Sequence, residues 1–145
     1  MIVIREMTNG DIDSIIEIEK SCFTNPWSKE SFNQELRNRL SLYLIIAVNK
    51  DIIGYAGLWK IMDEGHITNI AIKKQYQSKG YGYKLALALL NEGKKRKIKR
   101  FTLEVRKSNI SAIKLYSKIG FKKNGTRNNY YTNPKEDAII MWYED

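Results

Sequence analysis

The 145-residue sequence contains little of what metal centres, disulfides and membrane spans require. Its one cysteine, Cys22, has no partner for a disulfide within the chain, and its one histidine, His66, offers no His/Cys cluster for a metal. No apolar run approaches the roughly 20 residues that cross a bilayer, and the first residues, MIVIREMTNGD, lack the long apolar region of a signal peptide. We therefore expect a cytoplasmic protein without a metal site or a membrane partner.

The two rare residues also fit ordinary structural roles. Cys22 falls on the apolar face of an expected helix with Ile15 and Phe23, which favours core packing over a role as a nucleophile. His66 alternates with polar residues on an expected strand, and this position favours a structural role.

Proline is scarce as well, and no proline-rich linker, low-complexity segment or internal repeat divides the chain. Hydrophobic residues make up 43% and charged residues 28%, which is ordinary for a globular protein and too apolar for a disordered one. A chain of this length buries roughly 68 to 70% of its unfolded surface, enough for one sizeable core. The sequence therefore predicts a single domain over residues 1–145.

Positive charge is in excess, with a formal net charge of +9. This favours polyanionic partners, whether nucleic acid, an acidic surface or a phosphorylated cofactor, without choosing between them. The densest basic run, KKRKIKR at residues 94–100, fits a nucleic-acid patch but also the end of a helix, where cations complement the helix dipole. We favour the helix end and do not expect nucleic-acid binding.

Hydrophobic patterning divides the chain into a strand, two helices, three strands, a helix, a strand, a helix and two strands. The expected strands span residues 2–7, 42–48, 52–61, 66–72, 101–106, 121–125 and 137–143. The expected helices begin near residues 8, 28, 81 and 109. Short turns join the second, third and fourth strands, so these should form an antiparallel meander. The order predicts an α/β fold with a mixed, largely antiparallel central sheet flanked by helices.

Local signals mark the starts of the first two helices. Thr8 and Ser28 are expected N-caps, because a hydroxyl at that position accepts a hydrogen bond from the first helical amides. Trp27 precedes Ser28 and Phe32 occupies the fourth helical position, which is the spacing of a hydrophobic staple.

The segment QSKGYGYK, residues 77–84, places two glycines between an apolar strand and a helix. It is not a P-loop, since no glycine precedes Gly82 at the required spacing and no Ser or Thr follows Lys84. It is a poor dinucleotide fingerprint, because Leu85 stands where the third glycine belongs. Gly80 and Gly82 still open a helix whose first amides have no partners inside it, and such amides can hold an anion.

The next strand and helix carry residues with acid–base chemistry. In FTLEVR, Glu104 lies on the face opposite Phe101 and Leu103. If a helix covers that face, burial raises the carboxyl pKa and suits it to proton transfer; if the strand is half exposed, Glu104 lies in solvent. Tyr116 lies on the helix that begins near Asn109, where either chemistry or core packing fits its position.

Several segments together resemble a known family. NIAIKKQYQSKGYGYKLALALL followed by LEVRKSNISAIKLYSKIGF is similar to the acetyl-CoA-binding core of the GNAT acetyltransferases, and the order of elements resembles that fold over nearly the whole chain. NPWS, LEVRKSN and RNNYYTNPKEDAIIM, in this order, further resemble the RimI-type ribosomal-protein-alanine N-acetyltransferases. The resemblance implies a single-domain GNAT fold and an acetyl-CoA-dependent N-acetyltransferase that needs no metal.

The resemblance also implies roles for residues. The motif R/Q-x-x-G-x-G/A matches Gln77, Gly80 and Gly82, so the expected anion is the pyrophosphate of coenzyme A. Family members often carry Arg at the position of Ser78, and Lys79 could supply the missing charge. The residues implied to contact acetyl-CoA are Ile70, Ala71 and Ile72 on the strand edge, Gln77, Ser78, Lys79, Gly80, Tyr81, Gly82 and Tyr83 in the loop, and Asn109.

In the same way Glu104 would be the general base and Tyr116 the general acid, while Trp27 and Tyr131 would be walls of the groove for the acceptor. The implied acceptor is the N-terminal amine of a protein, most specifically the terminal alanine of small-subunit ribosomal protein eighteen, and a lysine or another amine remains the alternative. An α-amino group titrates near pH ~8 and lysine near ~10.4, so the terminal amine needs less help in losing its proton. Acids such as Asp63 and Glu64 would assist a basic acceptor if they face the groove.

Overall fold

A computed structural model of the chain describes residues 1–23 and 25–144. In these residues seven strands form one sheet, in the order β1-β2-β3-β4-β5-β7-β6. Its neighbouring strands are antiparallel except β4 and β5, which run parallel. The strands are β1 (Ile2–Glu6), β2 (Ser41–Val48), β3 (Asp51–Ile61), β4 (Glu64–Ile72), β5 (Arg100–Arg106), β6 (Lys122–Tyr131) and β7 (Glu136–Glu144). This confirms the predicted fold class and the β2–β3–β4 meander.

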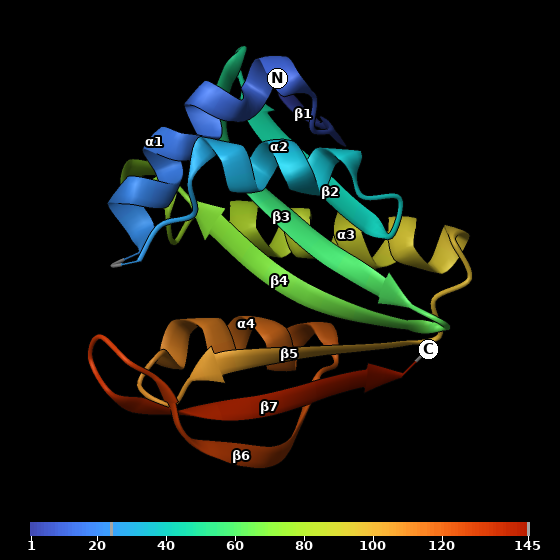
Figure 1. The fold of residues 1–145 in the computed structure, drawn as a ribbon, viewed down its shortest axis with the longest axis vertical. Helices are drawn as coiled ribbons and strands as arrows, with labels where there is room; N and C mark the ends of the chain where they lie inside the picture. Colours follow the sequence, from blue (N-terminus) through green and yellow to red (C-terminus); the bar gives the residue numbers. More distant parts are fainter. Residues whose placement is uncertain (24, 145) are drawn as a thin grey trace.

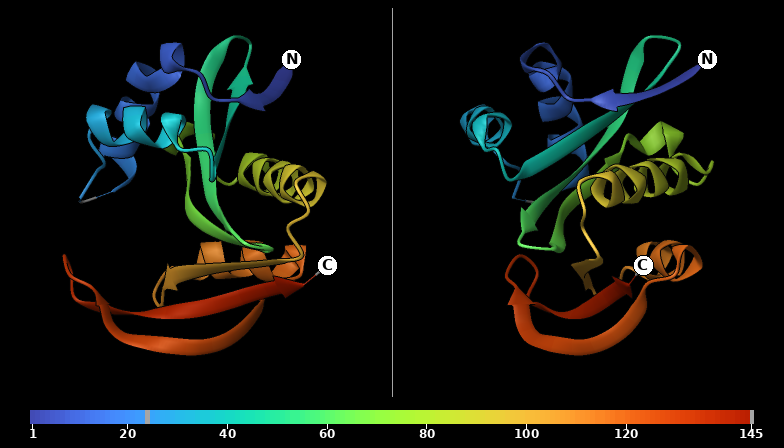
Figure 2. Two further views of the ribbon diagram at one scale, coloured as in Figure 1. Left: turned by 45° about the vertical axis from the view of Figure 1, so that its right-hand side comes forward. Right: turned by 90° about the vertical axis from the view of Figure 1, so that its right-hand side faces the viewer.

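The helices cover both faces of the sheet (Figures 1 and 2). They are α1 (Ile12–Cys22), α2 (Lys29–Arg37), α3 (Tyr81–Lys95) and α4 (Ile110–Ile119), with short 3-10 turns at Asn9–Asp11 and Lys74–Tyr76. Figure 2 shows α1 and α2 on one face and α3 and α4 on the other. Because side chains of a strand alternate between faces, the sheet divides the described apolar core into two clusters. The larger one lies under α3 and α4.

The N-terminal helices begin much as their capping residues predict. Ser28 Oγ accepts a hydrogen bond from the Ser31 amide at 3.1 Å, and the rings of Trp27 and Phe32 pack with centroids 5.3 Å apart. These contacts confirm the N-cap and the staple. At Thr8 a 3-10 turn comes first, because the Asp11 carboxylate accepts from the Thr8 amide at 2.8 Å and closes the turn. The α-helix therefore starts after Asp11 rather than after Thr8.

The last hairpin differs from its prediction in length. The strand expected at 121–125 extends over Lys122–Tyr131, and nearly all of its residues are exposed. Such a strand has no buried face, so hydrophobic alternation does not reveal it. It is held by its antiparallel pairing with β7 at the edge of the sheet.

The parallel strands β4 and β5 meet at one end and separate at the other (Figure 1). Among the described residues they pair only at Glu64↔Arg100, Gly65↔Phe101 and His66↔Thr102. Just beyond, the β3–β4 register shifts, so that Thr68 is an extra residue in β4. A bulge of this kind bends a strand and increases its twist. The shift coincides with the point where β4 and β5 diverge.

Candidate active site

A groove of about 400 Å³ lies where β4 and β5 diverge. Its walls come from α1 and the segment that leads to α2, from the two diverging strands, and from α4 and the end of β6. The groove brings together six of the predicted site residues, which are Trp27, Ile70, Glu104, Asn109, Tyr116 and Tyr131.

Glu104 lies on the floor of this groove with its side chain 10% exposed. Its Oε2 accepts a hydrogen bond from His66 Nε2 at 2.8 Å, and its Oε1 lies 3.5 Å from Arg127 Nε. The hydrogen bond from His66 holds the pKa of Glu104 below its ordinary value, and the charge of Arg127 acts in the same direction. Burial by itself raises this pKa, but His66 and Arg127 outweigh the loss of solvent, so the pKa is lowered overall.

His66 pairs with Glu104, although it does not itself line the groove. The parallel register places His66 of β4 beside Thr102 of β5, two residues before Glu104. The hydrogen bond to Glu104 raises the pKa of His66, and the imidazole is one-third exposed. The edge of the Trp59 ring packs against the imidazole, with centroids 6.4 Å apart. The result is an imidazole–carboxylate pair with one member open to solvent.

Two phenols line the groove near Glu104. Tyr116 projects from α4 and packs against Phe121, with ring centroids 5.8 Å apart. Burial raises the pKa of Tyr116 well above its ordinary value. Burial also raises the pKa of Tyr131 to about 12, although the Arg106 guanidinium lies 4.3 Å from the centre of its ring. Both hydroxyls therefore keep their protons at neutral pH and can donate them.

The glycine loop follows β4 and leads into α3. Gly80 is the N-cap of α3 with a φ of +89°, a conformation that favours glycine, and Ser78 has a φ of +61°. The first hydrogen bond of the helix runs from the Lys84 amide to the Gly80 carbonyl at 3.2 Å. The amides of residues 80–83 therefore have no acceptor inside the helix, as the sequence predicts. Gln77 fixes the loop, because its Nε2 donates to the Ile72 carbonyl at 2.9 Å.

Gly82 has a second reason to be glycine, which the loop pattern does not show. A Cβ at this position would lie 3.2 Å from Leu115 Cδ1 of α4. The start of α3 therefore packs closely against α4. At Gly80, in contrast, a Cβ would meet nothing within 4 Å among the described atoms, so the backbone conformation alone favours glycine there.

Of the three residues predicted to form the strand edge, only Ile70 lies in the groove lining of the described chain. The Ala71 carbonyl points towards β3, 2.7 Å from where a Cβ on Gly54 would lie. The Ile72 carbonyl accepts from Gln77 Nε2 and from Cys22 Sγ, the latter at 3.4 Å. The loop residues 77–83 lie outside this lining too, beyond the end of β4.

Sequence reasoning missed the contribution of α1 to the groove. Cys22 is half-buried and packs against the core, as expected, but it also lines the groove wall. Glu19, Phe23 and Asn25 line the same wall. The signal for Glu19 was faint, since it is one acidic residue among several in α1.

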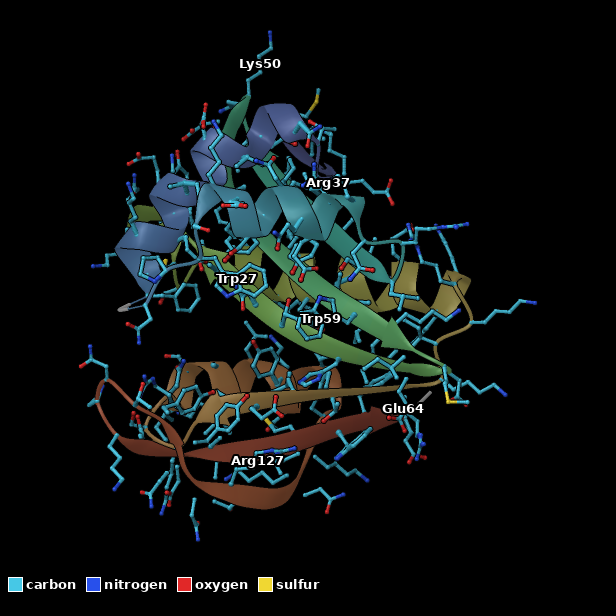
Figure 3. The ribbon with its side chains drawn as sticks, viewed as in Figure 1. Trp27, Arg37, Lys50, Trp59, Glu64 and Arg127 are labelled. Atoms are coloured by element: carbon cyan, nitrogen blue, oxygen red, sulfur yellow. The ribbon has the colours of Figure 1, made fainter. Side chains whose placement is uncertain are left out.

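The acids expected to assist a basic acceptor lie elsewhere. Asp63 and Glu64 belong to the turn where β4 begins, and Glu64 forms an ion pair with Arg100. Figure 3 shows Glu64 at the end where β4 meets β5, away from Trp27. Neither residue lines the groove described above.

No group of three or more His, Cys, Asp and Glu side chains within residues 1–23 and 25–144 is placed to hold a metal ion. No helix in that part of the chain is both long and apolar enough to cross a membrane.

Comparisons with known proteins agree with this geometry. A protein of Bacillus subtilis (strain 168), provisionally named a ribosomal protein bS18-alanine N-acetyltransferase, is 45% identical over 96% of this chain and 93% of its own length. The ribosomal protein bS18-alanine N-acetyltransferase of Escherichia coli (strain K12) is 35% identical over 97% of this chain and 96% of its own.

Solved structures show the same fold. The crystal structure of the ribosomal-protein-S18-alanine N-acetyltransferase from Escherichia coli superposes with a TM-score of 0.91 at 34% identity, over 99% of this chain and 94% of that one. Ard1 from Thermoplasma volcanium superposes with a TM-score of 0.90 at 25% identity, over 99% and 97%. Residues 12–121 match the model of the acetyltransferase (GNAT) family. The chain is therefore a member of the GNAT family of acetyltransferases.

Proposed function

We propose that this chain transfers the acetyl group of acetyl-CoA to the N-terminal amine of a protein, with the terminal alanine of ribosomal protein bS18 as its acceptor. The observation that carries the proposal is the meeting of Glu104 and Tyr116 in one groove. The relatives named above support the choice of acceptor, because they carry this activity in their names over nearly the full length of the chain.

Main-chain groups are proposed to hold most of the cofactor. The amides of residues 78–83 would bind the pyrophosphate, since they combine unpaired donors with the positive end of the α3 dipole. The edge of β4 at Ile70 would bind the amide-bearing pantetheine arm. Asn109 caps α4 through Oδ1, which accepts from the Ala112 amide at 3.1 Å, so its NH₂ group can donate to the cofactor.

Glu104 and its partners are suited to receive a proton from the acceptor. Only a neutral amine attacks a thioester carbonyl, and an α-amine with a pKa near ~8 is already partly neutral at pH 7. Glu104 is kept ionised by His66 and Arg127, so it can attract the ammonium and accept its proton, directly or through one water.

Tyr116 is proposed to complete the transfer. When the tetrahedral intermediate collapses, the C–S bond breaks and the leaving thiolate of coenzyme A needs a proton. The Tyr116 hydroxyl lines the groove and carries its proton at neutral pH, so it can donate to the leaving thiolate. Its raised pKa makes it a weaker acid than a free phenol. The acetyl group passes directly to the amine, so Cys22 need not carry it, although it lies in the groove wall.

The test offers acetyl-CoA together with two peptides and follows both free thiol and peptide mass. One peptide carries a free N-terminal alanine, and the other is blocked at its terminus and contains lysine. We expect a mass gain on the first peptide alone. Acetylation of the blocked peptide alone would replace the N-terminal acceptor with lysine and leave the family assignment intact.

A nucleic-acid-binding module is the second candidate, and the structure weakens it. The run at 94–100 surrounds the end of α3, as expected, and much of its charge is paired. Arg96 pairs with Glu6, Arg100 with Glu64, and Lys95 with Glu92 at 3.1 Å. Salt-dependent binding to RNA without thiol release from acetyl-CoA would favour this candidate instead.

A further inference from the structure

Glu19 is a buried carboxylate in the groove wall that the proposed reaction does not use. It lies on α1 and is 1% exposed. Its Oε2 accepts from the Trp27 amide at 2.8 Å, and its Oε1 accepts from the Tyr55 hydroxyl. A carboxylate that loses its water is costly unless such donors replace it, and burial raises the pKa of Glu19 despite them. The two hydrogen bonds therefore hold the Glu19 carboxylate, the Trp27 amide and the Tyr55 hydroxyl in fixed positions relative to one another.

Tyr55 links this carboxylate to the strand that carries the groove edge. Its hydroxyl accepts from Asn69 Nδ2 at 3.1 Å, and Asn69 lies in β4 between the extra residue Thr68 and Ile70. The bonds from Glu19 to Tyr55 and from Tyr55 to Asn69 thus join α1, β3 and the bulged part of β4.

Trp27 is connected to the same tyrosine by a second route. The Trp27 ring packs against Phe32, and Phe32 meets Tyr55 edge to face, with centroids 5.6 Å apart and ring planes at 89°. One route thus passes through hydrogen bonds to the Trp27 main chain and the other through rings to its side chain. Figure 3 shows Trp27 beneath the start of α2, on the side turned towards β5. Both the amide and the ring of Trp27 are therefore held relative to β4.

From these contacts we propose that Glu19 is a positioning residue that fixes Trp27 against the bulged part of β4 and thereby sets the width of the acceptor end of the groove. This inference rests on the proposed function, because it treats Trp27 as the wall next to the first residue of the acceptor. A fixed aromatic wall favours a small first side chain such as alanine and excludes a large one. The Trp27–Glu19 bond is then a determinant of selectivity rather than of chemistry.

The substitution Glu19→Gln tests this with little change in volume. A carboxamide has one oxygen, so it cannot accept from both the Trp27 amide and the Tyr55 hydroxyl in the arrangement described. The substitution Tyr55→Phe removes the same link from the other side and keeps the ring that supports Phe32. The matched control is Glu35→Gln, since Glu35 accepts from Trp59 Nε1 at 2.8 Å and from Ser41 outside the groove.

The experiment measures steady-state acetylation of two free-terminus peptides, one beginning with alanine and one with leucine, by the four proteins. For Glu19→Gln and Tyr55→Phe we expect the alanine peptide's KM to rise about three- to tenfold and the preference for alanine over leucine to fall by a similar factor. The kcat and the KM for acetyl-CoA should change by less than about twofold, because the linked groups touch neither Glu104 nor the glycine loop. Glu35→Gln should behave like the wild type.

Thermal unfolding of each variant separates positioning from general stability. A lower Tm with unchanged peptide KM and unchanged selectivity in both variants would overturn the inference while sparing the proposed function. If Glu19→Gln does not fold, Tyr55→Phe decides the question alone. A wild-type protein that acetylates neither peptide would refute the proposed function, and this inference would fall with it.

Discussion

The glycine loop before α3 presents main-chain amides, whereas the floor of the groove presents titratable side chains. The loop depends on the φ of Gly80 and on the start of α3, and it lies within one stretch of sequence. On the floor Glu104 is paired with His66 and Arg127, and the three residues come from three different strands. Binding at the loop should therefore depend on backbone conformation, and chemistry at the floor on charge.

Because the loop uses main-chain amides and the groove floor uses titratable side chains, the two regions should respond differently to mutation and to pH. At the loop only substitutions that change the backbone should matter greatly, because amides keep their dipoles whatever side chain they carry. On the floor a change of one atom alters which groups hold protons.

The largest effect is expected from Glu104→Gln, which keeps the shape of the side chain and removes the base. We expect kcat for an alanine peptide to fall by about a hundred- to ten-thousandfold. Binding of coenzyme A, measured by calorimetry, should stay within about twofold because the loop is untouched. Turnover within a factor of two of the wild type would show that Glu104 is not the base.

Removal of the acid should have a smaller but clear effect. For Tyr116→Phe we expect kcat to fall by at least about tenfold, since the thiolate would take its proton from water instead. The ring and its packing on Phe121 remain, so the Tm should change little. A loss of coenzyme A affinity with unchanged kcat would instead assign Tyr116 to binding.

Strain in the loop should weaken the cofactor without slowing the chemistry. Gly80→Ala places a Cβ at a φ of +89°, which costs about 1–2 kcal/mol and corresponds to about five- to thirtyfold in coenzyme A affinity if the loop shifts to relieve it. The kcat at saturating acetyl-CoA should be retained.

Gly125→Ala is the matched control for this strain. Gly125 has a φ of +110° in β6, and a Cβ there would lie no closer than 3.7 Å to its nearest neighbour, Ile140 Cδ1. We expect this strain to lower the Tm and to leave the affinity for coenzyme A normal. Equal losses of affinity in both variants would mean that the loop has no special role.

The smallest effect is on stability and depends on pH. The pKa of His66 is raised in the folded protein, so its pairing stabilises fully below roughly pH 6.5 and is lost as pH rises through the folded pKa. The pKa of Glu104 is lowered, so its contribution is present above about pH 4.3 and is lost as pH falls through the folded pKa. The Tm difference between the wild type and His66→Gln should be largest near about pH 5–6 and shrink by about pH 9. An equal difference at both pH values would show that the pair is not coupled to protonation.

Structural features that depend only on residues close together in the chain could be predicted from the sequence. The Ser28 cap and the Trp27–Phe32 staple involve residues at most five positions apart, and the αL conformation at Gly80 belongs to one residue. The order of elements followed from hydrophobic periodicity, and the resemblance to the GNAT family agreed with it. The roles of the site residues stay predictions.

Features that depend on pairing across the sheet could not be predicted. His66 and Glu104 are 38 positions apart and meet because of the three-pair register between β4 and β5. Without that register the partner of Glu104 is unknown, and burial alone gives the wrong direction for its pKa. The bond between Glu19 of α1 and Tyr55 of β3 spans 36 positions and depends on how the helix packs on the sheet, which local sequence patterns do not specify.

The short pairing between β4 and β5 also predicts how cofactor binding should change the local stability of the protein. Three residue pairs form a narrow seam between two portions of the sheet, and α3 and α4 touch behind it. The amide-bearing arm of a bound cofactor could form hydrogen bonds with the main chain of β4 beyond His66, where β5 no longer pairs with it. We therefore expect the amides of Ile67–Ile72 to exchange with deuterium more slowly when coenzyme A is bound than when it is absent, with a larger change there than elsewhere in the sheet.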